Sequence, residues 1–104
     1  MKYRTIIRSR ADCDEEEIFD FLARRSLATA HRFLDSLHET LRTISDRTSP
    51  GMPCAFENPK LAGLRWSKVN GFPNHLIFFR LDEDRLEVLR VLHDARDLET
   101  LLSS

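Results

Sequence analysis

The sequence has only two cysteines among its 104 residues, Cys13 and Cys54. Two isolated thiols supply neither a disulfide framework nor the clustered ligands of a zinc site. We therefore interpret both as free thiols in a reducing compartment. The sequence also lacks a glycine-rich phosphate loop and the ligand spacing of a metal motif, so it predicts no cofactor and no metal site.

Long hydrophobic runs are missing as well. No apolar stretch approaches the ~20 residues that a membrane-spanning helix needs, so we expect no membrane partner. The N-terminal segment MKYRTIIRSRADCDEEE is charged throughout and contains no apolar signal-peptide core. These two absences predict a cytoplasmic location.

Neither sign of charge dominates the sequence. Lysine and arginine number 16 against 17 aspartates and glutamates, which gives a net charge of −1. Binding to nucleic acid through counterion release needs a positive field. We therefore expect no direct sequence-specific DNA binding, although the balance is compatible with a local basic cleft.

The composition that remains is typical of a globular protein. Hydrophobic residues make up 41% of the chain and charged residues 32%, and the length suits a single domain over residues 1–104 with one modest core.

A strand and a helix are predicted at the start of the chain. Residues 2–9 are β-branched and partly alternating, which favours a strand. Residues 11–25 predict a helix, because Asp12 and Glu15 have the spacing of a capping box. We interpret the acidic residues 12–17, Asp14 included, as a solvated first turn, and the buried stripe as Ile18, Phe21 and Leu22.

A second, longer helix is predicted after Ser26, which is a suitable N-cap. Apolar residues then recur at helical spacing and form one face: Ala30, Phe33, Leu34, Leu37, Leu41 and Ile44. Because few residues separate the two helices, they are predicted to form an antiparallel hairpin.

The second half of the chain predicts strands. Residues 45–60 contain three prolines and are expected to be an irregular connection. Strands are predicted at 64–69, 75–81 and 86–92, and a short helix at 95–102 with Asp94 as its N-cap. The fold class is therefore α+β, in the order β-α-α-β-β-β with a short C-terminal helix. The helix hairpin should pack on one face of a largely antiparallel sheet.

The arginines among apolar strand residues need partners. We interpret Arg80 and Arg90 as ion-paired at the rim of the core, with Glu87, Asp82 or Asp84 as partners for Arg80. Strand alternation places Leu89 and Val91 on one face and Arg90 on the other. Trp66 is most simply a core or rim residue.

Several motifs of the second half together resemble the RelE/ParE toxin superfamily of type II toxin–antitoxin modules. The motifs are a leucine–arginine step at 64–65, a Gly-Phe-Pro turn at 71–73, an aromatic strand ending in Arg80, and RVLHDARD at 90–97. The resemblance implies a small antitoxin partner whose C-terminal part folds on the toxin surface.

The resemblance leaves the target open. RelE-like members are ribosome-dependent ribonucleases, and the matching positions for such a site are Arg65, His75, Arg80, His93 and Arg96. ParE-like members bind DNA gyrase and need no catalytic centre. For them the expected target contacts are Arg65, Trp66, Lys68, Arg90, His93 and Arg96.

The sequence favours the ParE-like alternative. The only tyrosine is Tyr3, so the C-terminal tyrosine common in RelE-like ribonucleases is missing, and the charge is balanced rather than strongly basic. A degenerate member that only binds a partner, and an unrelated α+β domain, are the remaining hypotheses.

Overall fold

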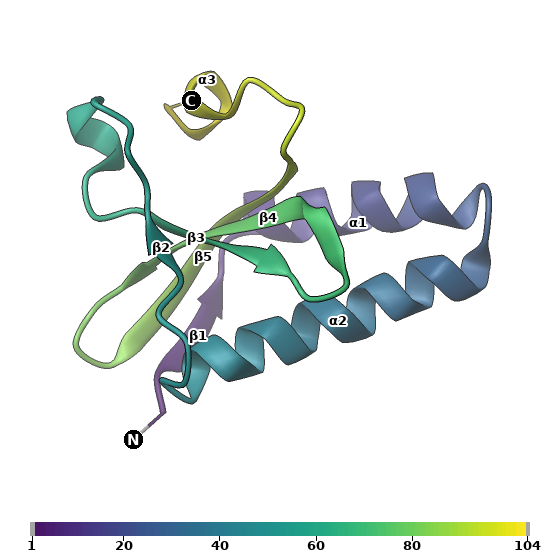
Figure 1. Ribbon diagram of the computed structural model, residues 1–104, viewed down its shortest axis with the longest axis horizontal. Helices are drawn as coiled ribbons and strands as arrows, with labels where there is room; N and C mark the ends of the chain where they lie inside the picture. Colours follow the sequence, from purple (N-terminus) through teal and green to yellow (C-terminus); the bar gives the residue numbers. More distant parts are fainter. Residues whose placement is uncertain (1, 104) are drawn as a thin grey trace.

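The computed structural model describes residues 2–103 (Figure 1). Its elements, in chain order, are β1 (Arg4–Ile7), α1 (Ser9–Ala23), α2 (Leu27–Ser45), β2 (Met52–Pro53), the 3-10 turn η1 (Pro59–Leu61), β3 (Arg65–Val69), β4 (Phe72–Leu81), β5 (Arg85–His93) and α3 (Leu98–Ser103). Within the described residues, no helix is long and apolar enough to cross a bilayer.

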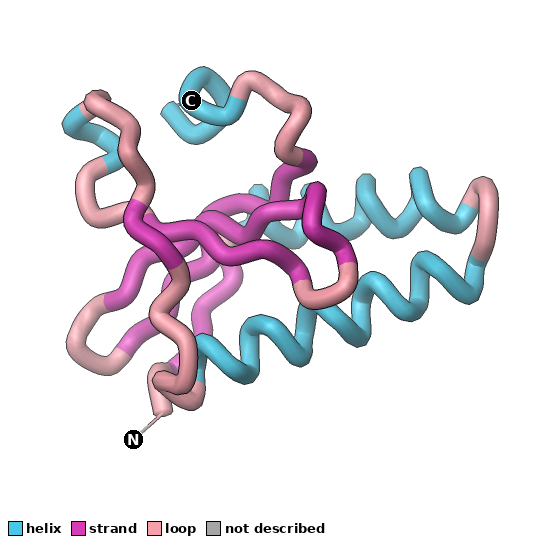
Figure 2. The backbone as a smooth tube through the Cα atoms, in the orientation of Figure 1, coloured by secondary structure: helices cyan, strands magenta, loops and turns pink. Residues whose placement is uncertain are grey.

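One five-stranded sheet, in the order β1-β5-β4-β3-β2, organises the molecule. β1 pairs with β5 in parallel, and the other neighbouring strands are antiparallel. The α1–α2 hairpin covers one face of the sheet, while α3 and η1 lie toward the other (Figures 1 and 2). The predicted α+β class and the largely antiparallel sheet are confirmed.

The helix α2 forms as its sequence predicts. The Oγ atom of Ser26 accepts a hydrogen bond from the Thr29 N–H at 3.2 Å and caps the first turn. The predicted apolar face is buried, with Phe33, Leu37 and Ile44 at most 1% exposed. These side chains form the larger core together with the sheet residues Val69, Ile77, Phe79, Leu86, Val88 and Val91.

A second, smaller core lies on the opposite face of the sheet. It contains Leu61, Leu64, Leu76, Phe78 and Leu92, and the α3 residues Leu98, Leu101 and Leu102 pack against it. Apolar burial, worth ~25 cal/mol per Å², therefore holds the terminal helix on the sheet.

The predicted N-cap and the predicted buried stripe of α1 are both wrong in part. The helix begins at Ser9, so its N-cap is Arg8, without a side-chain cap, and Asp12 lies within the first turn instead of capping it. The Arg8 N–H is already bonded to the Val88 carbonyl at 3.0 Å, which makes β1 lead directly into the helix. Phe21 is 61% exposed rather than buried, whereas Ile18 packs against the core.

The connection over residues 45–60 is more ordered than predicted. Met52–Pro53 pairs with β3, and Pro59–Leu61 forms a 3-10 turn. Pro53 is tolerated because β2 lies at the sheet edge. The strand β4 begins at Phe72, three residues earlier than expected, because residues 70–71 alone make the turn that precedes it.

The alternation predicted for β5 is also wrong. Phe78 pairs with Arg90 but Phe79 pairs with Val88, so Leu89 is an extra residue in a β-bulge. Leu89 therefore packs with the smaller core, on the face away from Val91.

Candidate functional site

The polar residues after β5 do not cap α3 as predicted. Asp94 donates its N–H to the Asn74 carbonyl at 2.8 Å, and α3 starts only at Leu98. The prediction that Asp94 is the cap is wrong, because this bond holds residue 94 at the sheet and delays the helix. Asp97 caps α3 instead. Its carboxylate accepts hydrogen bonds from the Thr100 N–H at 3.5 Å and from the Thr100 hydroxyl at 2.8 Å.

His93 lies at the end of β5 with its ring ordered by its neighbours. Its Nδ1 accepts the Ala95 N–H at 3.0 Å, which places the ring proton of the neutral form on Nε2. Asp94 Oδ1 lies 3.4 Å from the same Nδ1, a contact that is an ion pair only when the imidazole is protonated. The His93 ring meets His75 edge to face, with centroids 5.1 Å apart.

A pocket of about 400 Å³ opens beside these two histidines. We call it the histidine pocket. Its wall on α1 includes Ile18 and the exposed Phe21, and its other side is formed by His75, His93 and Arg96. Three of the five residues predicted for a ribonuclease site therefore lie together.

The environment of His75 favours its neutral form. The ring lies edge to face against Phe33, with centroids 5.1 Å apart. Burial lowers the pKa of His75 below its ordinary value, and the nearby His93 lowers it further, while Asp94 acts in the opposite direction.

This pKa shift predicts a pH dependence of stability. The unfolded chain takes up a proton at His75 near the ordinary pKa of 6.5, whereas the folded protein resists it. The free energy of unfolding should therefore decrease as the pH falls below 6.5. Thermal melting from about pH 7 to about pH 5.5 should show a smaller decrease for His75→Phe than for the wild type. An equal decrease in both proteins would contradict this assignment.

Arg65 and Arg80 lie away from the histidine pocket. Arg65 donates from Nε to the Pro50 carbonyl at 2.6 Å and holds the loop before β2. Arg80 donates from Nη2 to the Lys60 carbonyl of η1 at 2.8 Å. The predicted ion pair of Arg80 is wrong, because its guanidinium reaches η1 and Glu87 pairs with Arg8 instead.

Trp66 and Lys68 lie on β3, also outside the pocket lining. Trp66 is half-buried and packs against the smaller core, which confirms it as a rim residue. Lys68 is exposed. Arg65 pairs with Phe79 of the larger core and Trp66 with Phe78 of the smaller core, so adjacent predicted contacts lie on opposite faces.

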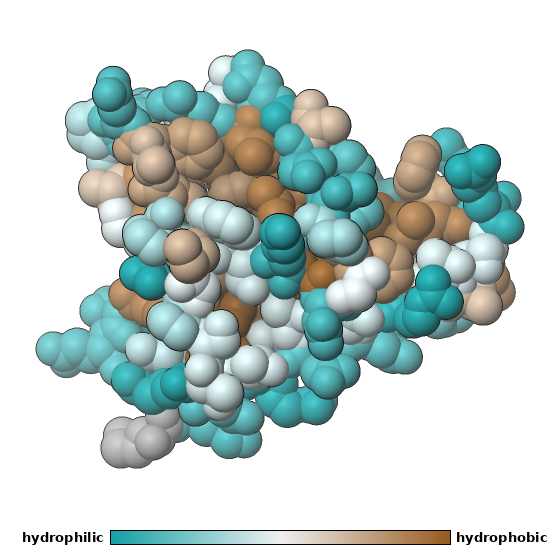
Figure 3. Space-filling view, in the orientation of Figure 1, coloured by the Kyte–Doolittle hydropathy of each residue, from teal (hydrophilic) through white to brown (hydrophobic). Residues whose placement is uncertain are grey.

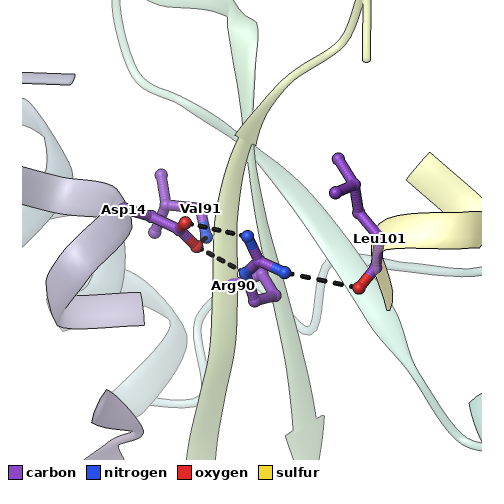
Figure 4. Close-up of polar contacts among 4 residues, drawn as sticks. All are labelled: Asp14, Arg90, Val91 and Leu101. Carbon is purple, nitrogen blue, oxygen red and sulfur yellow. Dashed lines mark hydrogen bonds and ion pairs between the residues drawn. The ribbon is translucent and has the colours of Figure 1, made fainter. Parts of the chain in front are cut away.

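The ion pair of Arg90 is confirmed, but its partner is one that the sequence analysis missed. Arg90 donates from Nε and Nη2 to the Asp14 carboxylate at 2.7 and 2.9 Å (Figure 4). The two residues are 8% and 5% exposed, so Asp14 is not part of a solvated turn. Hydrogen bonding to Asp14 is the main cause that raises the pKa of Arg90.

Asp14 also accepts a hydrogen bond from a backbone N–H of the sheet that has no partner strand. β1 ends at Ile7, and beyond that point the Val91 N–H of β5 donates to Asp14 Oδ2 at 3.0 Å. The third guanidinium nitrogen of Arg90 donates to the Leu101 carbonyl at 3.3 Å, so one ion pair joins α1, β5 and α3 (Figure 4). The helical spacing of the sequence could have indicated this role, because Asp14 lies on the same stripe of α1 as the buried Ala11 and the half-buried Ile18.

No metal site is apparent in residues 2–103, since no three histidine, cysteine or acidic side chains are arranged to hold an ion.

Two comparisons with known proteins found matches, one to a family model and one to solved structures of similar fold. A family model described as "ParE toxin of type II toxin-antitoxin system, parDE" matches residues 6–98. The chromosomal ParDE system of P. aeruginosa has a similar structure, with a TM-score of 0.69 and 16% identity over 88% of this chain and 96% of that chain. The E. coli DinJ-YafQ toxin–antitoxin complex gives a TM-score of 0.64 and 16% identity over 91% and 96%. At this identity both likenesses show the fold. No curated protein sequence matches significantly.

Proposed function

Because the chain belongs to the family of ParE toxins of type II toxin–antitoxin systems, we propose that it inhibits growth by binding DNA gyrase. One observation carries the choice against RNA cleavage. Arg65 and Arg80 are held by backbone carbonyls outside the histidine pocket, so the cations that such a reaction needs do not converge.

The chemistry inside the histidine pocket supports the same proposal. Burial disfavours protonated His75 in the pocket, and Arg90, which lies outside the pocket lining, has its positive charge balanced by Asp14. A phosphorane-like transition state would gain little from either group. The exposed Phe21 and the exposed Arg96 both line the pocket, and phenylalanine and arginine are residue types enriched at protein interfaces.

We therefore propose the histidine pocket as the gyrase contact, with Phe21, His93 and Arg96 as its main residues. Arg65 and Arg90 act through the fold, since both are used in internal hydrogen bonds. The partner that silences the protein is a small cognate antitoxin, and both act in the cytoplasm.

Arg96→Ala tests the contact. We expect the variant to melt like the wild type, because no hydrogen bond or ion pair of its side chain holds the described fold together. Inhibition of gyrase supercoiling should weaken by ~10-fold or more, the scale of an interface hot spot. Arg42→Ala, an exposed arginine of α2, is the control that should inhibit normally.

The second candidate function is ribosome-dependent mRNA cleavage, and the observation that favours it is the clustering of His75, His93 and Arg96. Purified protein should be assayed with gyrase and, separately, with translating ribosomes. Ribosome-dependent cleavage that falls ~10²-fold in His93→Ala would replace the gyrase proposal. A protein that inhibits neither would be a degenerate member that only binds its partner.

A further inference from the structure

A second cavity, of about 510 Å³, lies on the other side of Arg90, between the start of α1, η1 and α3. We call it the cationic cleft. We propose that it binds a phosphate monoester whose organic group is aliphatic. The inference does not depend on the proposed function, because the cationic cleft and the histidine pocket have no lining residue in common.

The charge of the cationic cleft is of one sign. No aspartate or glutamate lines it, and five cationic side chains do: Arg8, Arg10, Lys60, Arg80 and Arg90. Within residues 2–103, carboxylates form ion pairs with Arg8 and Arg90 but not with the other three. Three positive charges without an internal partner therefore line one cavity, in a protein whose net charge is −1. Such a cavity favours an anionic ligand.

The first turn of α1 adds backbone donors to these charges. Ser9 and Arg10 line the cleft where the helix begins. The N-cap residue Arg8 supplies no side-chain cap, and within residues 2–103 the N–H groups of Ser9 and Arg10 donate to no acceptor. Free N–H groups at the start of a helix suit phosphate oxygens, because the helix dipole also favours negative charge there. The cationic cleft therefore offers fixed donors as well as mobile cations.

The number of charges favours phosphate over carboxylate. A phosphate monoester carries a charge of roughly −1.5 to −2 near neutral pH and has three strong acceptor oxygens. A carboxylate has a single charge and two oxygens. It would leave more of the three unpaired cations and of the free N–H groups without a partner, so phosphate is the anion that the cleft fits better.

The rest of the cleft is aliphatic. Its apolar lining consists of Leu61, Leu64, Leu89, Leu101 and Leu102. Figure 3 shows apolar side chains gathered between α3 and η1, with hydrophilic residues around them. A free phosphate ion would leave this surface in water, whereas an aliphatic group on the phosphate would cover it.

The same lining argues against a nucleotide as the ligand. Nucleic-acid bases are commonly held by aromatic side chains on which they stack, and no aromatic residue lines the cleft. An alkyl phosphate is the ligand that uses both the cations and the leucines.

The first experiment titrates the protein with hexyl phosphate and follows the backbone amide resonances by NMR. We expect the largest shifts at Ser9 and Arg10, and binding ~10-fold or more tighter than that of inorganic phosphate. The double variant Arg10→Gln/Lys60→Gln should bind hexyl phosphate ~10-fold or more weakly. Arg25→Gln, an exposed arginine outside the cleft, is the matched control and should bind normally. Melting curves check that the double variant folds.

Two results would overturn the proposal. Equal binding of hexyl phosphate by the double variant and the wild type would reject the cationic cleft as the site. Binding of inorganic phosphate or adenosine monophosphate as tight as that of hexyl phosphate would reject the aliphatic ligand.

The second experiment identifies the source of the ester, since a free alkyl phosphate and the head group of phosphatidic acid share this chemistry. The wild type and the double variant are sedimented with phosphatidylcholine vesicles that contain or lack phosphatidic acid. Sedimentation that needs phosphatidic acid and is lost in the double variant would assign the cleft to the lipid head group. Absence of sedimentation, with hexyl phosphate still bound, would assign it to a free ester.

Discussion

Asp14→Ala is expected to lower the free energy of unfolding by about 3–5 kcal/mol, the cost of leaving a buried charge without its partner. The variant removes both bonds to the Arg90 guanidinium and the bond from the Val91 N–H. Arg90 is 8% exposed, so its guanidinium would keep little solvation to offset the loss of the carboxylate. Chemical denaturation at neutral pH measures the difference.

Two comparisons make the result specific to the ion pair. Glu16→Ala changes an exposed acid of the same helix, and its effect should stay within about 0.5 kcal/mol. The double variant Asp14→Leu/Arg90→Met removes both charges and should recover most of the lost stability. If the single variant is as stable as Glu16→Ala, the pair is not the link that holds α1 to β5.

Gly51→Ala is expected to destabilise the protein by about 2–5 kcal/mol. The backbone at Gly51 has φ +67°, a left-handed conformation that strains any residue with a Cβ. That Cβ would also lie 2.6 Å from the Trp66 carbonyl oxygen and 2.7 Å from Cζ of Phe79. Because one obstacle is backbone and the other a buried ring, neither can move at low cost.

Gly63→Ala separates the two causes. Gly63 has a similar φ of +79°, but nothing lies within 4 Å of the position its Cβ would take. We expect it to lose only about 1 kcal/mol, from backbone strain alone. Equal losses in the two variants, measured by thermal melting, would show that the close approach to Phe79 does not contribute.

Local patterns predicted the elements whose determinants are local. The helix α2 was predicted with its face and its Ser26 cap, because its apolar spacing and its capping residue lie within a few turns of each other. The strands β3 to β5 followed from turn residues and β-branched runs. The element order and the resemblance then identified the fold.

The errors have long-range causes. Asp14 pairs with a residue 76 positions away, so composition alone made it look like one of several solvated acids. Leu89 is displaced by a bulge that depends on how β5 meets β4. Asp94 is held by Asn74 across the sheet, and so the terminal helix starts later than its sequence indicates.

The sequence predicted only part of the candidate site, because its residues come together through long-range contacts. His75 and His93 were named together only through the family resemblance, and the structure makes them register partners on neighbouring antiparallel strands. The contribution of Phe21 could not be predicted, because it depends on where α1 leaves the sheet.

The parallel pairing of β1 with β5 has a consequence for the order of events during synthesis. Arg4–Ile7 is made well before its partner, residues 85–88, because most of the domain lies between them in the sequence. β1 can therefore join the sheet only after β5 has been made, and the long stretch of chain between the two strands makes this pairing slow. A prematurely terminated chain that lacks β5 has no partner for Asp14 and no His93 or Arg96. We expect such fragments to be unfolded and harmless to the cell that makes them.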